Sequence, residues 1–155
     1  MHHTFIRKAT PNDLETLLRF EQGVINAERH FDLTLKGEPT HYYDLQEMIT
    51  APHIELLVAV VNGELVGSGY ARIESSKPYL QHNKHAYLGF MYVEPAHRGK
   101  GINALIIEAL ENWISSQQLH EVRLDVYHQN ESAIKAYEKA GFSKHMIEMR
   151  KKIKT

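Results

Sequence analysis

Residues 93–103 read VEPAHRGKGIN and mark the place where a predicted strand passes into a predicted long helix. Gly99 and Gly101 remove side chains at the point where the backbone turns, so several N–H groups can face an anion without obstruction. The positive end of the helix dipole lies there too, and Arg98 and Lys100 add two full charges. The segment therefore predicts a pyrophosphate site, with a tight turn that is merely basic as the alternative.

A strand precedes this segment and an amphipathic helix follows it. Residues 86–93 are aromatic and apolar and stop before Pro95, which favours a strand. From Ile102 onward, apolar residues recur at the spacing of one helix face. The predicted buried stripe consists of Ile102, Leu105, Ile106, Ala109, Leu110, Trp113 and Ile114. We expect this stripe to belong to the core and not to a ligand site.

The rest of the chain reads as short strands and helices without a linker or repeat. Asn62-Gly63 predicts a type I′ hairpin that joins strands over 54–61 and 64–73. Thr10-Pro11-Asn12-Asp13 predicts the start of a first helix after a strand over 5–8. The remaining expected elements are a helix over 42–49, a loop over 75–84, a strand over 121–127, a helix from Asn130 to the stop at Gly141-Phe142, and a strand over 144–153.

Length and composition exclude several classes of protein. The chain has 155 residues, 18 Lys plus Arg, 19 Asp plus Glu, a net charge of -1 and no cysteine. Disulfide scaffolds, thiolate metal sites and cysteine nucleophiles are therefore excluded. A near-neutral charge argues against nucleic acid as a partner, and the longest apolar run, residues 56–61, is too short to span a membrane. We expect a cytoplasmic protein of one domain, residues 1–155.

Two known phosphate-binding patterns can be compared with residues 98–103. The Walker loop, Gly-x-x-x-x-Gly-Lys-Ser/Thr, does not occur in the sequence. The dinucleotide fingerprint is matched by Gly99, Gly101 and Ala104, with Asp125 about 20 residues further on. However, five residues separate the strand from Gly99, and only 30 residues follow Asp125, too few for the remaining parallel strands. An NAD-binding oxidoreductase is kept as a secondary alternative.

A second motif lies downstream, where residues 130–142 read NESAIKAYEKAGF. RGKGI at 98–102 and this segment together resemble motifs A and B of the GNAT superfamily of acetyl-CoA-dependent N-acetyltransferases, motif B being Asn-x-x-Ala-x-x-x-Tyr-x-x-x-Gly-Phe. The resemblance covers residues 54–150 well. It implies an α/β single-domain GNAT-like fold, with a mixed, mostly antiparallel central sheet of about seven strands flanked by about four helices.

The resemblance implies that the protein transfers an acetyl group from acetyl-CoA to a primary amine of a small molecule or peptide. The pantetheine arm of coenzyme A is then expected in a gap between the strands over 86–93 and 122–127, bound as an added strand. The expected coenzyme A contacts are Met91, Tyr92, Val93, Arg98, Gly99, Lys100, Gly101, Ile102, Asn103, Asn130, Ala133 and Tyr137. The family carries glycine or alanine where this chain has Asn103, whose backbone N–H is expected to stay available.

Catalysis in this family requires a proton donor and a base. Tyr137 is similar to the family's proton donor to the leaving sulfur, so we expect it to be catalytic. Members with a carboxylate base often carry glutamate at the position of Tyr87, and a tyrosine hydroxyl is a poor base at neutral pH. Glu28, His85 or a water molecule are the other candidates. A non-catalytic acyl-CoA-binding sensor is therefore a further alternative.

Histidines and tyrosines outside these motifs offer other roles. The 11 histidines include His82-x-x-His85, whose spacing suits metal ligands. The sequence places no third ligand nearby, so we expect no metal site. Tyr42, Tyr43 and Tyr79 are candidates for lining an acceptor pocket. Dimers are common among similar proteins, so a homodimer stays open, and the identity of the acceptor amine does too.

Overall fold

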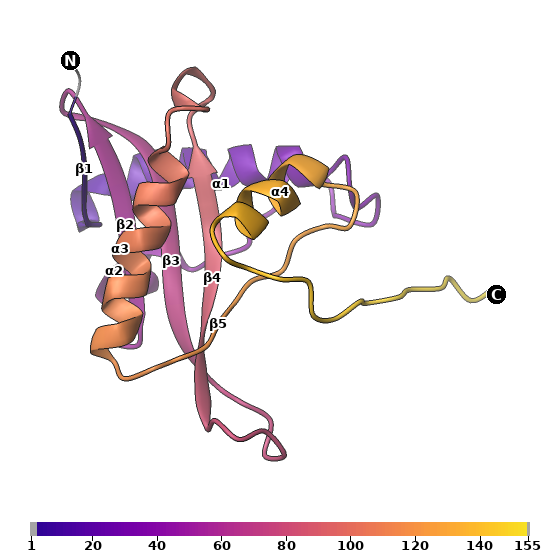
Figure 1. The fold of residues 1–155 in the computed structure, drawn as a ribbon. Helices are drawn as coiled ribbons and strands as arrows, with labels where there is room; N and C mark the ends of the chain where they lie inside the picture. The colour runs from indigo at the N-terminus through magenta and orange to yellow at the C-terminus, as the bar shows by residue number, and fades with distance from the viewer. Residues whose placement is uncertain (1–2, 155) are drawn as a thin grey trace. The chain divides into compact units, whose positions relative to one another are not determined.

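The computed structural model describes residues 3–154 and divides the chain into two compact units, residues 1–125 and 126–155, described here one after the other (Figure 1). The elements of the first unit are β1 (Thr4–Lys8), α1 (Leu14–Glu28), α2 (Leu45–Thr50), β2 (Ile54–Val61), β3 (Glu64–Ser75), β4 (Lys84–Val93), α3 (Ile102–Ser116) and β5 (Val122–Arg123). Short 3-10 helices cover Pro11–Asp13 and Pro95–His97. The second unit contains α4 (Glu131–Lys139).

The strands of the described residues form one mixed sheet in the order β1-β2-β3-β4-β5. Neighbours from β1 to β4 pair antiparallel, whereas β5 pairs parallel with β4. The predicted hairpin is confirmed, because β2 and β3 meet at Asn62 and Gly63, whose φ angles of 52° and 79° are the positive values that a type I′ turn requires. A sheet with one parallel pair does not match the doubly wound parallel sheet of the dinucleotide fold.

Helices cover both faces of this sheet. Figure 1 shows α3 in front of the strands and α1 behind them. The core on the side of α1 and α2 includes Leu17, Phe20, Met48, Leu56, Val58, Tyr70 and Phe90. No helix within residues 3–154 combines the length and the apolar character needed to cross a bilayer.

The buried face of α3 is rotated slightly from the predicted stripe. Its buried residues are Ile102, Ile106, Ile107, Leu110 and Ile114. Leu105, which was predicted to be buried, is 40% exposed, and Ile107 takes its place. The contact with the sheet runs along one row of residues spaced by four, from Ile102 to Ile114, so Leu105 lies at the margin of the buried face.

The second unit begins and ends its helix as predicted. The side-chain oxygen of Asn130 accepts a hydrogen bond from the N–H of Ala133 at 3.3 Å and caps α4. Gly141 has a φ of 103°, and the N–H of Phe142 donates to the carbonyl of Tyr137 at 3.0 Å. The rings of Phe142 and Tyr137 also meet edge to face at 5.9 Å, so Phe142 packs back on the helix.

The predicted C-terminal strands are shorter or absent. The strand expected over 144–153 is wrong, because residues 142–154 contain no helix or strand. The strand expected over 121–127 is reduced to Val122–Arg123, so the described sheet has five strands instead of about seven. A strand forms only where a neighbour supplies hydrogen bonds, and the apolar side chains of Met146 and Ile147 remain exposed.

A partly buried ion pair fixes the first strand to the start of the first helix. Asp13 accepts hydrogen bonds from two guanidinium nitrogens of Arg7 at 2.8 and 3.0 Å and from the N–H of Thr10 at 2.8 Å. The Asp13 side chain is only 7% exposed. The hydrogen bond from Arg7 is the main cause that lowers the pKa of the Asp13 carboxyl. The predicted helix start at Thr10 and Asp13 is confirmed, and it also anchors β1.

We expect Asp13→Asn to lower the free energy of unfolding at neutral pH by about 2 kcal/mol, because a hydrogen bond to a charged group contributes about 1.5 to 3 kcal/mol. The lowered pKa stabilises the fold above the ordinary carboxyl pKa, and this contribution is lost as the pH falls through the folded-state value. The difference between the two proteins should therefore shrink in acid. Chemical denaturation across neutral and acidic pH checks this, with the exposed Glu15→Gln as a control that changes neither quantity.

Candidate active site

The edge of β4 that faces β5 is paired over two residues only. Ala86 lies opposite Val122, and Tyr87 lies opposite Arg123. From 88 to 93, no strand within residues 3–154 pairs with this edge. An unpaired edge presents N–H and C=O groups that an extended ligand can bind as an added strand. The pairing therefore stops between the same two strands for which the family resemblance implies a gap.

A β-bulge interrupts β4 along this free edge. Ser68 and Tyr70 of β3 lie opposite Tyr92 and Gly89, so two residues of β4 stand opposite one residue of β3. Phe90 lies in the bulge and has a φ of 55°. The fully buried hydroxyl of Ser68 donates to the carbonyl of Phe90 at 3.0 Å. This hydrogen bond fixes the bulge and with it the direction of the main chain beyond it.

The main-chain groups of Met91 and Val93 point away from β3. The N–H of Glu94 donates to the carbonyl of Val66 on β3 at 2.8 Å, and the groups alternate in direction along a strand. The carbonyl of Val93 already has a partner, because Arg98 donates to it from Nε at 2.9 Å. The N–H and carbonyl of Met91 and the N–H of Val93 therefore remain as the part of this edge that is open to a ligand.

Arg98 joins the turn after β4 to the strand itself. Besides its hydrogen bond to Val93, its guanidinium lies 5.9 Å from the centre of the Tyr92 ring. The side chain is exposed, so its charge stays next to the turn while Nε holds the end of the strand. The sequence predicted the positive charge of Arg98 but not its hydrogen bond to the carbonyl of Val93.

The turn before α3 has the backbone that an anion site needs. Gly99 and Gly101 have φ angles of 75° and 80°, which side-chain-bearing residues rarely adopt, and a Cβ at either position would meet nothing within 4 Å. Within residues 3–154, no protein acceptor takes a hydrogen bond from the N–H groups of 99–104. The exposed Lys100 lies between the glycines. The turn thus offers free amides, a helix N-terminus and positive charge in one place.

The two residues that open α3 have different roles. The side chain of Ile102 is buried in the core, so only its backbone faces the turn. Asn103 is half-buried in the first turn of the helix, and its N–H is among the free amides. Asn103 therefore departs from the pattern of the resembled family in its side chain, while its backbone N–H has no protein acceptor within residues 3–154.

A carboxyl group and two tyrosines lie together near the bulge. The hydroxyl of Tyr42 donates to Oε1 of Glu28 at 2.9 Å. The ring of Tyr43 lies 4.9 Å from that of Phe90. Burial raises the pKa of the Tyr43 hydroxyl, and the negative charge of Glu28 raises it further. Burial raises the pKa of the Glu28 carboxyl, although the hydrogen bond from Tyr42 lowers it in part. A carboxyl with a raised pKa is better matched to proton uptake near neutral pH.

Glu21 of α1 fixes the segment that carries these tyrosines. Its carboxylate is fully buried and accepts from the backbone N–H groups of Tyr42 and Tyr43, both at 2.9 Å. Nδ1 of His41 lies 2.8 Å from the same carboxylate. Because Glu21 takes these amides, the helix predicted over 42–49 begins only at Leu45. A buried carboxylate is stable only with such hydrogen-bond donors, so Glu21 holds residues 41–43 in place. We call this set of contacts the Glu21 clamp.

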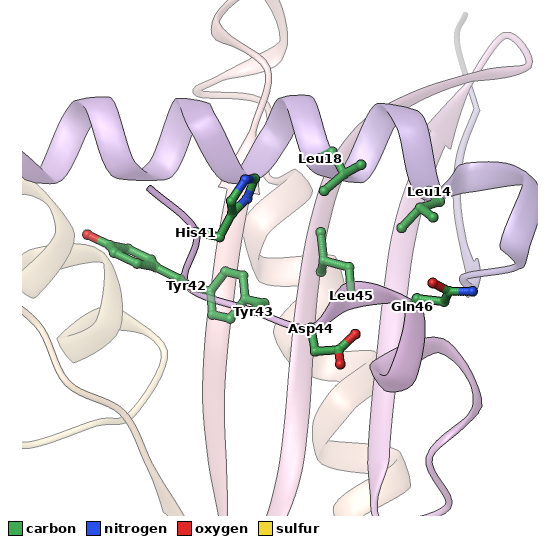
Figure 2. A pocket seen from close by; sticks show the side chains of 8 residues that line it. All are labelled: Leu14, Leu18, His41, Tyr42, Tyr43, Asp44, Leu45 and Gln46. Carbon is green, nitrogen blue, oxygen red and sulfur yellow. The ribbon is translucent and has the colours of Figure 1, made fainter. Parts of the chain in front are cut away.

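A surface hollow of about 470 Å³ lies between α1 and this segment. Its lining residues are Leu14, Leu18, His41, Tyr42, Tyr43, Asp44, Leu45 and Gln46. Figure 2 shows Leu14 and Leu18 on α1 facing the segment, with Tyr42 directed away from them. The hollow contains two of the three tyrosines predicted for an acceptor pocket and none of the predicted coenzyme A contacts. The third, Tyr79, is 81% exposed on the loop between β3 and β4.

The other two protein groups considered as bases are poorly suited to that role. The hydroxyl of Tyr87 donates to Asp125 at 3.1 Å, and burial raises the pKa of this hydroxyl, so it stays protonated at neutral pH. His85 lies five residues before Phe90 on the same strand, about 17 Å away at the rise of an extended chain. Among the three side chains, Glu28 alone combines proximity to the bulge with a favourable pKa.

The remaining predicted site residues belong to the second unit. Asn130 caps α4 with its side-chain oxygen, and Ala133 supplies the N–H that it accepts. Tyr137 lies half-buried on the same helix against Phe142. These three residues share the start and one side of α4, as motif B requires.

Sequence reasoning missed Ser68 and Glu21, although each left a signal. Ser68 stands between Gly67 and Gly69 in a stretch, residues 65–71, that carries no other polar side chain except the tyrosine hydroxyl, so a buried hydroxyl there needs a partner. Glu21 follows Leu17 by one helical turn, so it falls on the buried face of α1. An acid on an apolar helix face indicates a buried hydrogen-bond network, but not which amides it binds.

Comparison with known proteins supports this description of the fold. Streptothricin acetyltransferase of Escherichia coli is 34% identical over 85 residues, which are 55% of this chain and 45% of that protein. IAA acetyltransferase of Azospirillum brasilense is 28% identical over 122 residues, 79% of this chain and 75% of that one. The structure of a tetramutant of BH1408 protein from Bacillus halodurans has a TM-score of 0.85 at 26% identity and covers 96% of this chain and 99% of its own.

The chain thus spans less than half the length of the streptothricin enzyme that it matches. A family model described as the acetyltransferase (GNAT) family matches residues 23–142, from within α1 to the end of the second motif. Because this match extends over more than half of the sequence, the chain belongs to the acetyltransferase (GNAT) family.

Proposed function

We propose that this acetyltransferase moves an acetyl group from acetyl-CoA to a primary amine of a small molecule or peptide. One observation carries the proposal: the unpaired edge of β4 leads directly into the turn at 99–104 with its free amides. The edge suits an extended arm that bears amide groups, and the turn suits a diphosphate. Coenzyme A joins both parts in one molecule.

Each part of the coenzyme A substrate is assigned to residues of the chain. The amides from Gly99 to Asn103 hold the pyrophosphate, with Lys100 and Arg98 as nearby positive charges. The main chain around Met91, Tyr92 and Val93 holds the pantetheine arm. In the second unit, Asn130 donates from its side-chain amide, since its oxygen already caps α4, and the small Ala133 lets the arm approach.

The chemistry needs a base for the amine and an acid for the sulfur. We assign the base to Glu28, whose pKa is raised by burial, and the acid to Tyr137. The bulge at Phe90 turns main-chain N–H groups toward the ligand edge, where they stabilise negative charge on the carbonyl oxygen in the transition state. Direct attack of the amine on the thioester then needs no covalent enzyme intermediate.

The acceptor is proposed to be an amine because of what lies beside the bulge. Glu28 offers a carboxylate, and Tyr42 and Tyr43 offer ring faces, all of which attract an ammonium group. The named relatives point to different acceptors, so their names support acetyl transfer in general and not one particular substrate.

Titration calorimetry with acetyl-CoA and with NAD tests the first half of this proposal. We expect binding of acetyl-CoA and none of NAD; the reverse result would favour an oxidoreductase. An amine panel with detection of the released thiol tests the second half. Binding of acetyl-CoA with no thiol release from any amine would favour a non-catalytic sensor.

A charged residue at Gly99 should abolish acetyl-CoA binding. Gly99→Asp places a negative charge among the amides proposed for the pyrophosphate and also strains a backbone with a φ of 75°. Gly63→Asp is the matched control, because Gly63 has a φ of 79° and equal space around it but lies in the β2–β3 hairpin. Calorimetry should show normal affinity for Gly63→Asp; equal affinities of both variants would contradict the assigned pyrophosphate site.

Tyr137→Phe should lower kcat about 100-fold while the dissociation constant of acetyl-CoA stays within about twofold, as expected for a group that acts mainly in the transition state. Steady-state kinetics and calorimetry measure the two quantities. The exposed Tyr79→Phe should match the unmodified protein in both. An unchanged kcat at every pH would remove Tyr137 from the mechanism.

The pH profile of kcat/KM should report Glu28. Because burial raises the pKa of Glu28, the acidic limb is expected above the ordinary glutamate value. Tyr42→Phe removes a hydrogen bond that favours the ionised carboxylate, so the limb should move to higher pH. Glu28→Gln should remove the limb and lower kcat/KM about 100-fold, whereas the exposed Glu15→Gln should change neither.

A further inference from the structure

Three side chains that the proposed reaction does not use meet at the far end of β4. They are His82 of the loop before β4, His85 near its start, and Glu121 just before β5. One ligand atom from each lies within 4.8 Å of the other two. The sequence showed the two histidines, but Glu121 lies 36 residues after His85 and joins them only through the fold.

His82 lies between the carboxylate of Glu121 and the guanidinium of Arg123. Nε2 of His82 lies 2.9 Å from Oε2 of Glu121 and 3.1 Å from a guanidinium nitrogen of Arg123. If Nε2 carries a proton, it donates to Glu121, whose Oε2 also accepts from Nε of Arg123. If Nε2 carries no proton, its lone pair is open to a donor or to a metal ion that the neighbouring carboxylate also binds.

His85 is already oriented as a metal ligand. Its Nδ1 lies 2.8 Å from the hydroxyl of Ser76, which leaves Nε2 for another partner. Nε2 points toward Glu74, whose Oε1 is 3.5 Å away, and the His85 side chain is only 7% exposed. Metal-bound histidines are held through their second nitrogen in this way, which fixes the tautomer and the direction of the ring.

We propose that His82, His85 and Glu121 form a binding site for a divalent transition-metal ion of the zinc type. Two imidazoles and one carboxylate are a ligand set that Zn²⁺ accepts, with a fourth position left for Glu74 or water. Tetrahedral coordination at about 2.1 Å separates ligand atoms by about 3.4 Å. The ligand atoms lie within 4.8 Å of one another, and the His82–Glu121 separation is 2.9 Å, so the observed separations extend to both sides of that value.

The ion reaches the site from solvent. His82 and Glu121 are 35% and 40% exposed and line a surface hollow of about 500 Å³. Arg123 competes with the ion, because its Nε donates to Oε2 of Glu121 at 2.6 Å. In the metal-free protein Arg123 thus neutralises the carboxylate, and the ion has to displace this guanidinium from it.

The site would brace the part of the sheet that holds the gap open. β5 pairs with β4 only through Ala86 and Tyr87, and both pairs lie next to His85 and Glu121. A bound ion ties the loop, β4 and the start of β5 together at this point. It therefore stabilises the fold without touching the proposed acetyl-CoA site at the other end of β4.

Metal titration of the full chain, freed of metal with a chelator, tests this inference. We expect one Zn²⁺ per chain by calorimetry, a higher Tm with Zn²⁺, and with Co²⁺ the visible absorption of a tetrahedral site. His82→Ala and Glu121→Gln should each weaken binding about tenfold or more. Arg123→Gln should tighten it, because the competing cation is gone.

Controls separate this site from adventitious binding to other histidines. His53→Ala removes an exposed histidine outside the cluster and should leave affinity and Tm shift unchanged. Because His82 and Glu121 are partly exposed, their variants are expected to fold, and the Tm without metal verifies this. The inference is overturned if Zn²⁺ does not bind or if binding is the same in His82→Ala, Glu121→Gln and His53→Ala. Acetyl-CoA binding is independent of either outcome.

Discussion

Main-chain hydrogen bonding along β4 is the constraint on which the rest of the structure depends. One edge of this strand pairs with β3 along its length except at the bulge, while within residues 3–154 the other edge pairs with β5 over Ala86 and Tyr87 only. Buried main-chain N–H and C=O groups must form hydrogen bonds. The unpaired edge of β4 is therefore stable only because water or a ligand can reach it. Helices α1 and α3 bury the faces of the sheet, and the edge is left for a ligand.

Local signals account for the parts of the fold that the sequence predicted. The Asn62-Gly63 turn, the helix start with Thr10 as N-cap and the stop at Gly141 each depend on residues within a few positions of one another. The prediction of a strand over 144–153 is wrong, because a pattern of apolar residues does not show whether a neighbouring strand is present to form the hydrogen bonds. Leu105 was misplaced for a similar reason, since the buried width of a helix depends on the surface that it meets.

In the candidate site, too, residues that act locally could be predicted from the sequence and residues with distant partners could not. The glycines of the turn before α3 were readable because they act through their own backbone. Ser68 and Glu21 were not, because the partner of Ser68 lies 22 residues away and those of Glu21 lie 20 or more residues away. These pairings are decided by strand register and by the course of the segment after α1. Glu121 shows the same limit, since the cluster with His82 exists only after β5 is placed beside β4.

Glu21 also has a consequence for how this protein diversifies. The Glu21 clamp holds the chain at residues 41–43, and α1 holds it up to Glu28, so the intervening stretch is tethered at both ends. Long surface connections tolerate changes in length at a small entropic cost. Mutations, insertions and deletions within residues 30–40 are therefore expected to cost little stability. They would change the surface next to Tyr42 and Tyr43, where the acceptor amine is proposed to bind, and leave the sheet and its helices unchanged.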